Sequence, residues 1–586
     1  MRQFLKIFIA ALLAMAVFTV IIVLVMAGWV GSIASTEKPE VGSKGVLYID
    51  LQQTLPEQTL DNPLADLGVD DHYDVPGLYD MVRLIRYAKT DSSIKGIYLR
   101  CNENGNGLAS SEELRDALLD FKTSKKFLYA YGDVISQRAY YIANVADRIY
   151  CNPQGGVDWK GFAIQYLFFR QALEKLEIEP QIFYAGKFKS ATEPFRADQM
   201  TEPNRLQSSV FLNDIYNRFL VQVAAQRNTD TATLHQCANG LLIRTAADAV
   251  KYKLVDGAEY DDVVKNEIRQ KTGTPENTKL NFVMAGKYAK AVNYKAGKGS
   301  DKIAVIFAQG NIVEGKGERS EIGGDTYRWL IRKARMDKDV KAIVVRVNSG
   351  GGSAMASENM WRELVLARKD KPVVLSFGDY AASGGYYMSC GADSIFSQPN
   401  TLTGSIGVFS LVPNMKKFFG NKLGLTFDGV KTGTYADMAT VSRPLNEVEK
   451  RYMQTGVDSI YQTFLTRVAD GRKMSVPMVD SIAQGRVWTG SRALGLGLVD
   501  RMGGLQDAID CAARMSHLKE YRIREYPEPM GWWEKLFGGY KNTAKSAAVK
   551  EELGEQGFKI YTSLKKLKEF TGSSQARLPF EMDYNF

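Results

Sequence analysis

The sequence predicts an α/β protein that contains two copies of one domain, each built from βαβ units around a largely parallel sheet. Residues 84–161 align with residues 330–407 at a constant offset of 246 and without a gap. A register of this length indicates a duplicated domain. Within the second copy, apolar runs at 341–347 and 372–377 flank a helical run at 356–368, which is the alternation typical of parallel sheets.

The aligned copies separate residues that maintain the fold from residues that carry chemistry. Tyr140 aligns with Tyr386, and we interpret such identities as part of the shared fold. Gln137, in contrast, occupies the position in the first copy that Ser383 occupies in the second. The difference at this position predicts that chemistry resides in the second copy.

An uncharged stretch of 24 residues at 7–30 follows Arg2 and Lys6. As a helix it would be about 36 Å long, which is enough to cross a bilayer. A cleaved signal peptide is the alternative, since residues 32–35 resemble a cleavage site, but the apolar stretch is longer than a signal peptide requires. We therefore expect a retained single-pass anchor, with residues 1–6 in the cytoplasm because of their positive charge and with the body exported.

Polar connectors divide the rest of the chain. Residues 31–45 form a predicted linker before the first copy, which is expected over 46–294. A second linker at 295–302 precedes the second copy, which is expected over 303–520. The tail at 521–586 shows no counterpart in the repeat; a helix on the membrane surface and a packed tail are both compatible with its composition.

Composition and residue spacing exclude several classes of ligand. The net charge of +9 comes from 75 basic and 66 acidic residues without a basic cluster that contains aromatic residues, so we expect no nucleic-acid partner. The five cysteines lack metal-ligand spacing and the three histidines do not cluster. We therefore expect no zinc site and no other metal or cofactor. An odd number of cysteines leaves at least one unpaired.

Two glycine-rich junctions between a strand and a helix make the second copy the candidate catalytic domain. Ser383 precedes two glycines at a helix start, where backbone amides are unpaired and carry partial positive charge. The Gly384 amide can stabilise an oxyanion that forms when Ser383 attacks a carbonyl group. The junction at 349–353 offers Gly351 or Gly352 as the second donor, because neither has a side chain that would exclude a substrate.

A nucleophilic serine needs a base, and no histidine lies near either junction in the sequence. A buried lysine can serve if desolvation lowers its pKa by several units from about 10.4. Lys189 follows an apolar segment of the first copy, and Lys187 is the neighbouring alternative. When Gly186 is aligned with Gly433, Lys189 falls on Ala436. One copy has thus kept the lysine and the other the serine, which predicts an active site made by both copies.

These residues belong to longer motifs: GKFKSATEPFRADQM (186–200), RVNSGGGSAMASE (346–358), GDYAASGGYY (378–387) and TLTGSIGV (401–408). In combination the motifs resemble the signal peptide peptidase A family in its long two-domain form, also called protease IV. The resemblance extends over nearly the whole chain up to the tail. One departure is Gly350, where the family usually has proline.

The resemblance implies that Ser383 is the nucleophile, Lys189 the general base and Ser405 a residue that orients the lysine. Lys189 is preferred to Lys187 because the family's lysine directly precedes the serine of the KSA-EPF motif. The resemblance further implies a Clp-protease/crotonase-like fold and a membrane-anchored serine endopeptidase that degrades cleaved signal peptides. It also implies a homotetramer, anchored in the bacterial inner (plasma) membrane lipid by the N-terminal helix, with a periplasmic catalytic body.

Two other functions stay open at this stage. A crotonase-like acyl-CoA enzyme would share the fold and the oxyanion donors, but such enzymes are commonly soluble and do not need a split serine and lysine. A catalytically silent membrane scaffold would keep the fold without chemistry, as Gln137 and Arg138 suggest for the first copy alone. The presence of Ser383 and Lys189 on one chain favours the peptidase.

Overall fold

The computed structural model describes residues 39–59, 76–295, 297–528, 574–578 and 583–585, with scattered residues before position 22. The predicted anchor at 7–30 and most of the predicted tail therefore lie largely outside the described residues. Among the residues that are described, no helix is both long enough and apolar enough to cross a membrane.

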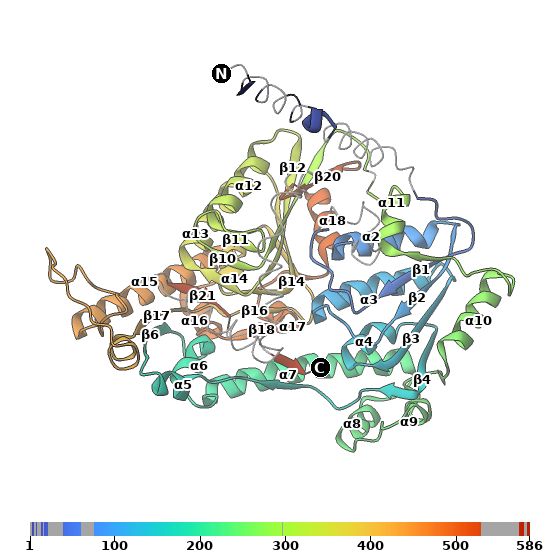
Figure 1. Cartoon of the computed structure of the whole chain (residues 1–586), viewed down its shortest axis with the longest axis horizontal. Coiled ribbons are helices and arrows are strands. Elements are labelled where there is room, and N and C mark those ends of the chain that lie inside the picture. Colours follow the sequence, from blue (N-terminus) through green and yellow to red (C-terminus); the bar gives the residue numbers. More distant parts are fainter. Residues whose placement is uncertain are drawn as a thin grey trace.

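The first copy contains a six-stranded sheet in which every neighbouring pair of strands is parallel. Its strand order is β7-β4-β3-β2-β1-β8, and Figure 1 labels the four central strands, β1 to β4. In chain order the strands are β1 (Gly45–Asp50), β2 (Ile94–Arg100), β3 (Phe127–Ile135), β4 (Arg148–Val157), β7 (Gly257–Ala258) and β8 (Phe282–Met284). The connecting helices are α2 (Leu78–Thr90), α3 (Leu108–Lys122) and α4 (Gln137–Ala143). The expected βαβ architecture is thus confirmed for the first copy.

The second copy repeats this arrangement in an eight-stranded sheet with the path β18-β16-β14-β12-β9-β20; off this path, β15 pairs with β14, and β19 pairs with β15. Its strands are β9 (Lys302–Gln309), β12 (Val340–Ser349), β14 (Val373–Ala382), β15 (Ser394–Ser397), β16 (Leu402–Gly404), β18 (Val487–Thr489), β19 (Arg501–Met502) and β20 (Arg522–Tyr526). The helices α12 (Gly324–Met336), α13 (Ala354–Asp370) and α14 (Gly384–Ser389) connect its central strands. The duplication predicted from the sequence is therefore confirmed.

The strand β20 shows that the repeat extends further than the sequence indicates. It pairs in parallel with β9, as β8 pairs in parallel with β1 in the first copy. Residues 522–526, assigned from the sequence to a tail without a counterpart, therefore occupy the position in the second sheet that β8 occupies in the first. Sequence similarity between the two short strands is too low to indicate this correspondence.

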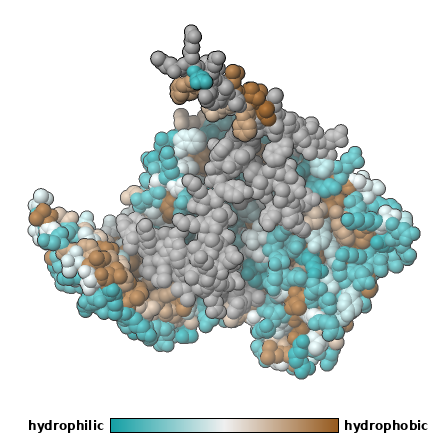
Figure 2. Space-filling model, in the orientation of Figure 1, coloured by the Kyte–Doolittle hydropathy of each residue, from teal (hydrophilic) through white to brown (hydrophobic). Residues whose placement is uncertain are grey.

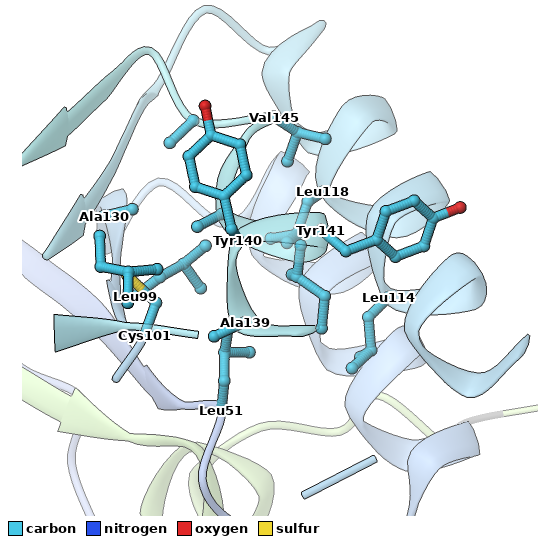
Figure 3. Packing of buried hydrophobic residues seen from close by; sticks show 14 of the residues in the cluster. Leu51, Leu99, Cys101, Leu114, Leu118, Ala130, Ala139, Tyr140, Tyr141 and Val145 are labelled. Atoms are coloured by element: carbon cyan, nitrogen blue, oxygen red, sulfur yellow. The ribbon is translucent and has the colours of Figure 1, made fainter. Parts of the chain in front are cut away.

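The aligned tyrosines have the same structural role in both copies. The Tyr140 hydroxyl donates to the carbonyl oxygen of Leu254 at 2.5 Å, and the Tyr386 hydroxyl donates to that of Leu498 at 2.8 Å. Figure 3 shows Tyr140 among the apolar side chains of the first core, which include Leu99. These buried hydroxyls are paired, as buried polar groups must be.

A third sheet joins the two copies, with the order β11-β10-β13-β21-β17-β6. Its strands are β6 (Glu179–Ala185), β10 (Asn311–Val313), β11 (Glu321–Gly323), β13 (Gly351–Ser353), β17 (Val408–Asn414) and β21 (Gln575–Arg577). The strand β6 of the first copy pairs antiparallel with β17 of the second over its full length, from Val408↔Ala185 to Asn414↔Glu179. This pairing carries the segment after β6, including Lys189, into the second copy.

Buried charges also cross the boundary between the copies. Arg346 on β12 is fully buried and forms ion pairs with Glu57 at 2.8 Å and with Glu113 on α3 at 2.6 Å. Asp379 on β14 accepts hydrogen bonds from the Ala109 and Ser110 amides in the first turn of α3. Because breaking a buried pair leaves an uncompensated charge, these contacts oppose separation of the copies.

Candidate active site

Ser383 lies at the sharp turn between β14 and α14. Its backbone has φ 53° and ψ −113°, a conformation that costs a non-glycine residue of the order of 1–3 kcal/mol and that occurs mostly at functional sites. The turn is held by the Ser383 amide, which donates to the carbonyl oxygen of Gly404 at 2.8 Å. The side chain is completely buried. A strained strand-to-helix turn of this kind presents a hydroxyl for nucleophilic attack.

Lys189 meets Ser383 directly. Its Nζ lies 2.8 Å from Ser383 Oγ, 3.0 Å from the Ser405 carbonyl oxygen and 3.1 Å from Ser405 Oγ. The lysine is 1% exposed, and burial lowers the pKa of its amine well below the ordinary value of 10.5. A neutral amine can accept the hydroxyl proton of Ser383, which a protonated one cannot.

Lys187 occupies a different environment. Its side chain is exposed, and its Nζ lies over the Phe188 ring at 5.3 Å from the centroid. The structure therefore brings Lys189, and not Lys187, to the serine. Ser405, in contrast, is buried and has φ 51°, which directs both its carbonyl and its hydroxyl at the lysine.

The glycines of the two junctions converge beside Ser383. A Cβ built on Gly351 would lie 2.7 Å from the Gly384 amide nitrogen, and a Cβ built on Gly384 would lie 3.1 Å from the Gly352 amide nitrogen. All three glycines are buried. A Cβ on Gly350, where the resemblance leads one to expect proline, would have only ordinary contacts with Leu578. The departure from the motif therefore leaves the convergence of the amides intact.

Two residues that support Lys189 were not predicted from the sequence. Gln207, on α7 (Glu202–Arg227), donates to the Phe188 carbonyl oxygen at 3.0 Å and to Ser190 Oγ at 2.9 Å. The amide of Val487 donates to the Gln207 side-chain oxygen at 3.1 Å. Gly485 packs against the lysine's own main chain, since a Cβ on Gly485 would lie 2.7 Å from its nitrogen and Cα. In the sequence, only the glycine itself indicates the contact of Gly485 with Lys189. Nothing in the sequence indicates the hydrogen bonds of Gln207.

The corresponding place in the first copy is closed by side chains. The side-chain oxygen of Gln137 accepts from the Lys160 and Gly161 amides, each at 2.9 Å. Arg138, which aligns with Gly384, donates to the carbonyl oxygen of Asn106 at 2.6 Å, and Asn106 aligns with Gly352. The first copy therefore has neither a nucleophile nor open amides at this place.

No metal-binding cluster is found in the part of the chain that the structure describes. All five cysteines are buried and free. The chemistry described above needs only the serine, the lysine and backbone amides.

The model of the family described as "Peptidase family S49" matches residues 120–274 and 366–519. "Protease 4" of Salmonella typhi is 36% identical to the chain over 527 residues, which are 87% of this chain and 85% of that protein. "Protease 4" of Haemophilus influenzae is 35% identical over 456 residues, 75% of this chain and 73% of that protein. "Putative signal peptide peptidase SppA" of Enterococcus faecium is 34% identical and covers 39% of this chain and 67% of that protein.

The contact of Gly485 with Lys189 generates a prediction about reactivity. In Gly485→Ala, the added methyl group displaces the lysine main chain, and a displacement of about 1 Å can reduce a reaction rate about 100-fold. We expect the rate at which a serine-directed phosphonate probe labels Ser383 to fall by about this factor.

Gly497→Ala is the matched control for this variant. Gly497 has φ 72° and Gly485 has φ 76°, so both changes cost about 1–2 kcal/mol of backbone strain. The Cβ on Gly497 would meet only the flexible end of Met474. Equal labelling rates in the two variants would show that Gly485 does not position the lysine.

Proposed function

The chain belongs to peptidase family S49 and is a serine peptidase, and we propose that it uses Ser383 as the nucleophile and Lys189 as the general base. The observation that carries this assignment is the 2.8 Å contact between Lys189 Nζ and Ser383 Oγ. Neither an acyl-CoA enzyme nor a silent scaffold has a use for a buried, neutral lysine against a serine at a strained turn.

The geometry supports a two-step acyl transfer. Lys189 accepts the Ser383 proton while Oγ attacks the peptide carbonyl, and the developing oxyanion receives hydrogen bonds from the Gly384 and Gly352 amides. The Gly351 amide already donates to Ser349 Oγ at 3.1 Å. Lys189 then gives its proton to the departing amine. In the second step it takes a proton from water, which hydrolyses the acyl-enzyme ester. Ser405 keeps the lysine in place through its hydroxyl and its carbonyl oxygen.

The third sheet supports an extended peptide as the substrate. The strands β13 and β17 do not pair with each other, and one strand position lies between them. A peptide that takes the place of β21 at this position would gain main-chain hydrogen bonds from the edges of β13 and β17, as in other cases of strand addition. The carbonyl groups of the bound peptide would then lie beside Gly351 and Gly352 of β13.

We propose further that the substrates are apolar peptides such as cleaved signal peptides. The apolar stretch at 7–30 would hold the enzyme at the bacterial inner membrane, where such peptides remain after preprotein cleavage. The name of the relative from Enterococcus faecium supports this substrate class. The catalytic body would then lie on the periplasmic side.

An exposed segment of the second copy supports assembly into a homo-oligomer. When Gly186 is aligned with Gly433, residues 426–432 correspond to β6. The strand β6 belongs to the first copy and pairs with β17 of the second copy. Residues 426–432 project from the body instead (Figure 1) and expose Phe427 by 57%. Figure 2 shows apolar residues on this projection. In an oligomer, residues 426–432 of one subunit would contact the first copy of the neighbouring subunit. Head-to-tail contacts of this kind form a ring when they close, and the resemblance favours a tetramer.

The dyad predicts a specific pattern of inactive variants. Ser383→Ala and Lys189→Ala should each lower kcat/KM on an apolar peptide by at least about 1,000-fold, because the nucleophile and base act as a unit. Lys187→Ala, which removes the exposed lysine two residues earlier, should retain activity. Circular dichroism should show native folding in all three. Full activity in either dyad variant would refute the mechanism.

The pH dependence of the reaction should report the buried amine. Lys189 is active only when neutral, so kcat/KM falls as the pH drops through its pKa. Because burial lowers that pKa, the midpoint of this acid limb should lie well below 10.5. Lys189→Arg should stay inactive at every pH, since a guanidinium is not deprotonated in proteins. If a Lys189 variant keeps residual activity and its kcat/KM falls at the same acidic pH as that of the wild type, the titrating group is not Lys189.

The exposed segment can be tested through the mass of the assembly. Phe427→Asp combined with Val430→Asp should lower the molar mass measured by light scattering, because it places charge in the expected interface. Val263→Asp, on α10 (Asp261–Thr272) of the first copy, changes a residue that is 38% exposed and serves as the control. A monomeric wild type, or an unchanged mass in the double variant, would contradict the proposal.

A further inference from the structure

A strand from late in the chain already occupies the position between β13 and β17. The strand β21 pairs antiparallel with β13 and, at one position, with β17, with the partners Gly351↔Arg577, Gly352↔Ala576, Ser353↔Gln575 and Phe409↔Gln575. Two flanking hydrogen bonds extend this pairing. The Ala354 amide donates to the Ser574 carbonyl oxygen at 3.2 Å, and the Leu578 amide donates to the Gly350 carbonyl oxygen at 2.7 Å.

Ala576 lies where the residue under attack is expected. A Cβ built on Gly384 would be 3.0 Å from its carbonyl oxygen, and a Cβ on Gly351 would be closer still. Its partner in β13 is Gly352, so the carbonyl oxygen lies among the three glycines of the oxyanion site. The Ala576 side chain is completely buried, and a large side chain does not fit there.

We propose that residues 574–578 are an intramolecular substrate of this active site, and that Ser383 cleaves the bond between Ala576 and Arg577; the inference rests on the proposed function. Ser383 Oγ bonds to the Ala576 carbonyl carbon as its proton moves to Lys189. The bond to the Arg577 nitrogen breaks, and that nitrogen takes the proton from Lys189. Water then hydrolyses the ester, which leaves a carboxylate on Ala576 and restores the Ser383 hydroxyl.

A second pairing holds the tail beyond the cleavage position. The strand β22 (Asp583–Asn585) pairs antiparallel with β5 (Ala163–Gln165) of the first copy. By the offset of 246, β5 corresponds to residues 409–411 of β17, so the tail pairs with equivalent strands of both copies. Fixed at two points, the strand keeps its register in the cleft and competes with external peptides for the same edge of β13.

Intact-mass spectrometry of the purified full chain tests the cleavage. The wild type should lose the chain from Arg577 onward, in a first-order process whose rate is independent of protein concentration. Ser383→Ala should keep its full mass. Ala576→Trp should also stay intact because the indole cannot enter the buried position, whereas the matched variant Ala576→Ser should be cleaved like the wild type.

Occupancy of the cleft is measured separately, in the background that cannot cleave. If the strand fills the cleft in nine molecules of ten, an external peptide binds about tenfold more weakly than to an open cleft. A fluorescent apolar peptide should therefore bind Ser383→Ala/Ala576→Trp about tenfold more tightly than Ser383→Ala. Equal affinities in the two variants would contradict the proposal that residues 574–578 fill the cleft.

An assay on an external apolar peptide distinguishes the two proposals. A wild type that cleaves this peptide but keeps its own mass, or that cuts itself at another bond, refutes the intramolecular substrate and leaves the peptidase function standing. A wild type that cleaves neither the peptide nor itself refutes the proposed function as well.

Discussion

The burial of one amine beside one hydroxyl sets the requirements for the rest of this structure. Lys189 contacts two hydroxyls and a carbonyl oxygen, and desolvation is the cause of its lowered pKa. Burial of a charged amine would cost several kcal/mol, so the site is stable with the lysine neutral, which is the form that can act as a base. Because the lysine and the serine come from different copies, water must be excluded at the boundary between two domains.

The duplicated residues show how this boundary is stabilised. Arg100 and Asp133 of the first copy form an ion pair with each other, with exposed side-chain fractions of 24% and 46%. The aligned residues of the second copy, Arg346 and Asp379, contact the first copy instead, through Glu113 and the start of α3. The same residue types thus stabilise a surface in one copy and the domain interface in the other. Identity at a repeated position therefore does not establish an identical role.

The sequence predicts the parts of the site whose signals are local or repeated. The junctions around Ser383 and Gly351 consist of contiguous residues, and Lys189 stands out because its aligned partner is alanine. Gln207 and Val487 are 280 positions apart, so their contact leaves no pattern in the sequence. The strands β20 and β21 were missed for a related reason: each is short, and its place in a sheet is set by partners far away in the chain.

The two copies show two solutions to one physical problem at the oxyanion site. Backbone amides that converge in a buried space cost about 1–3 kcal/mol each when they lack acceptors. In the first copy, the amide of Asn106, which aligns with Gly352, donates to Asn104 Oδ1, and Arg138 stands at the position of Gly384, so no oxyanion site is open there. In the second copy a side chain at Gly351 or Gly384 would block substrates, so the acceptor must be removable. A strand whose carbonyl oxygen enters among the glycines satisfies both needs, because it stabilises the resting site and can leave it.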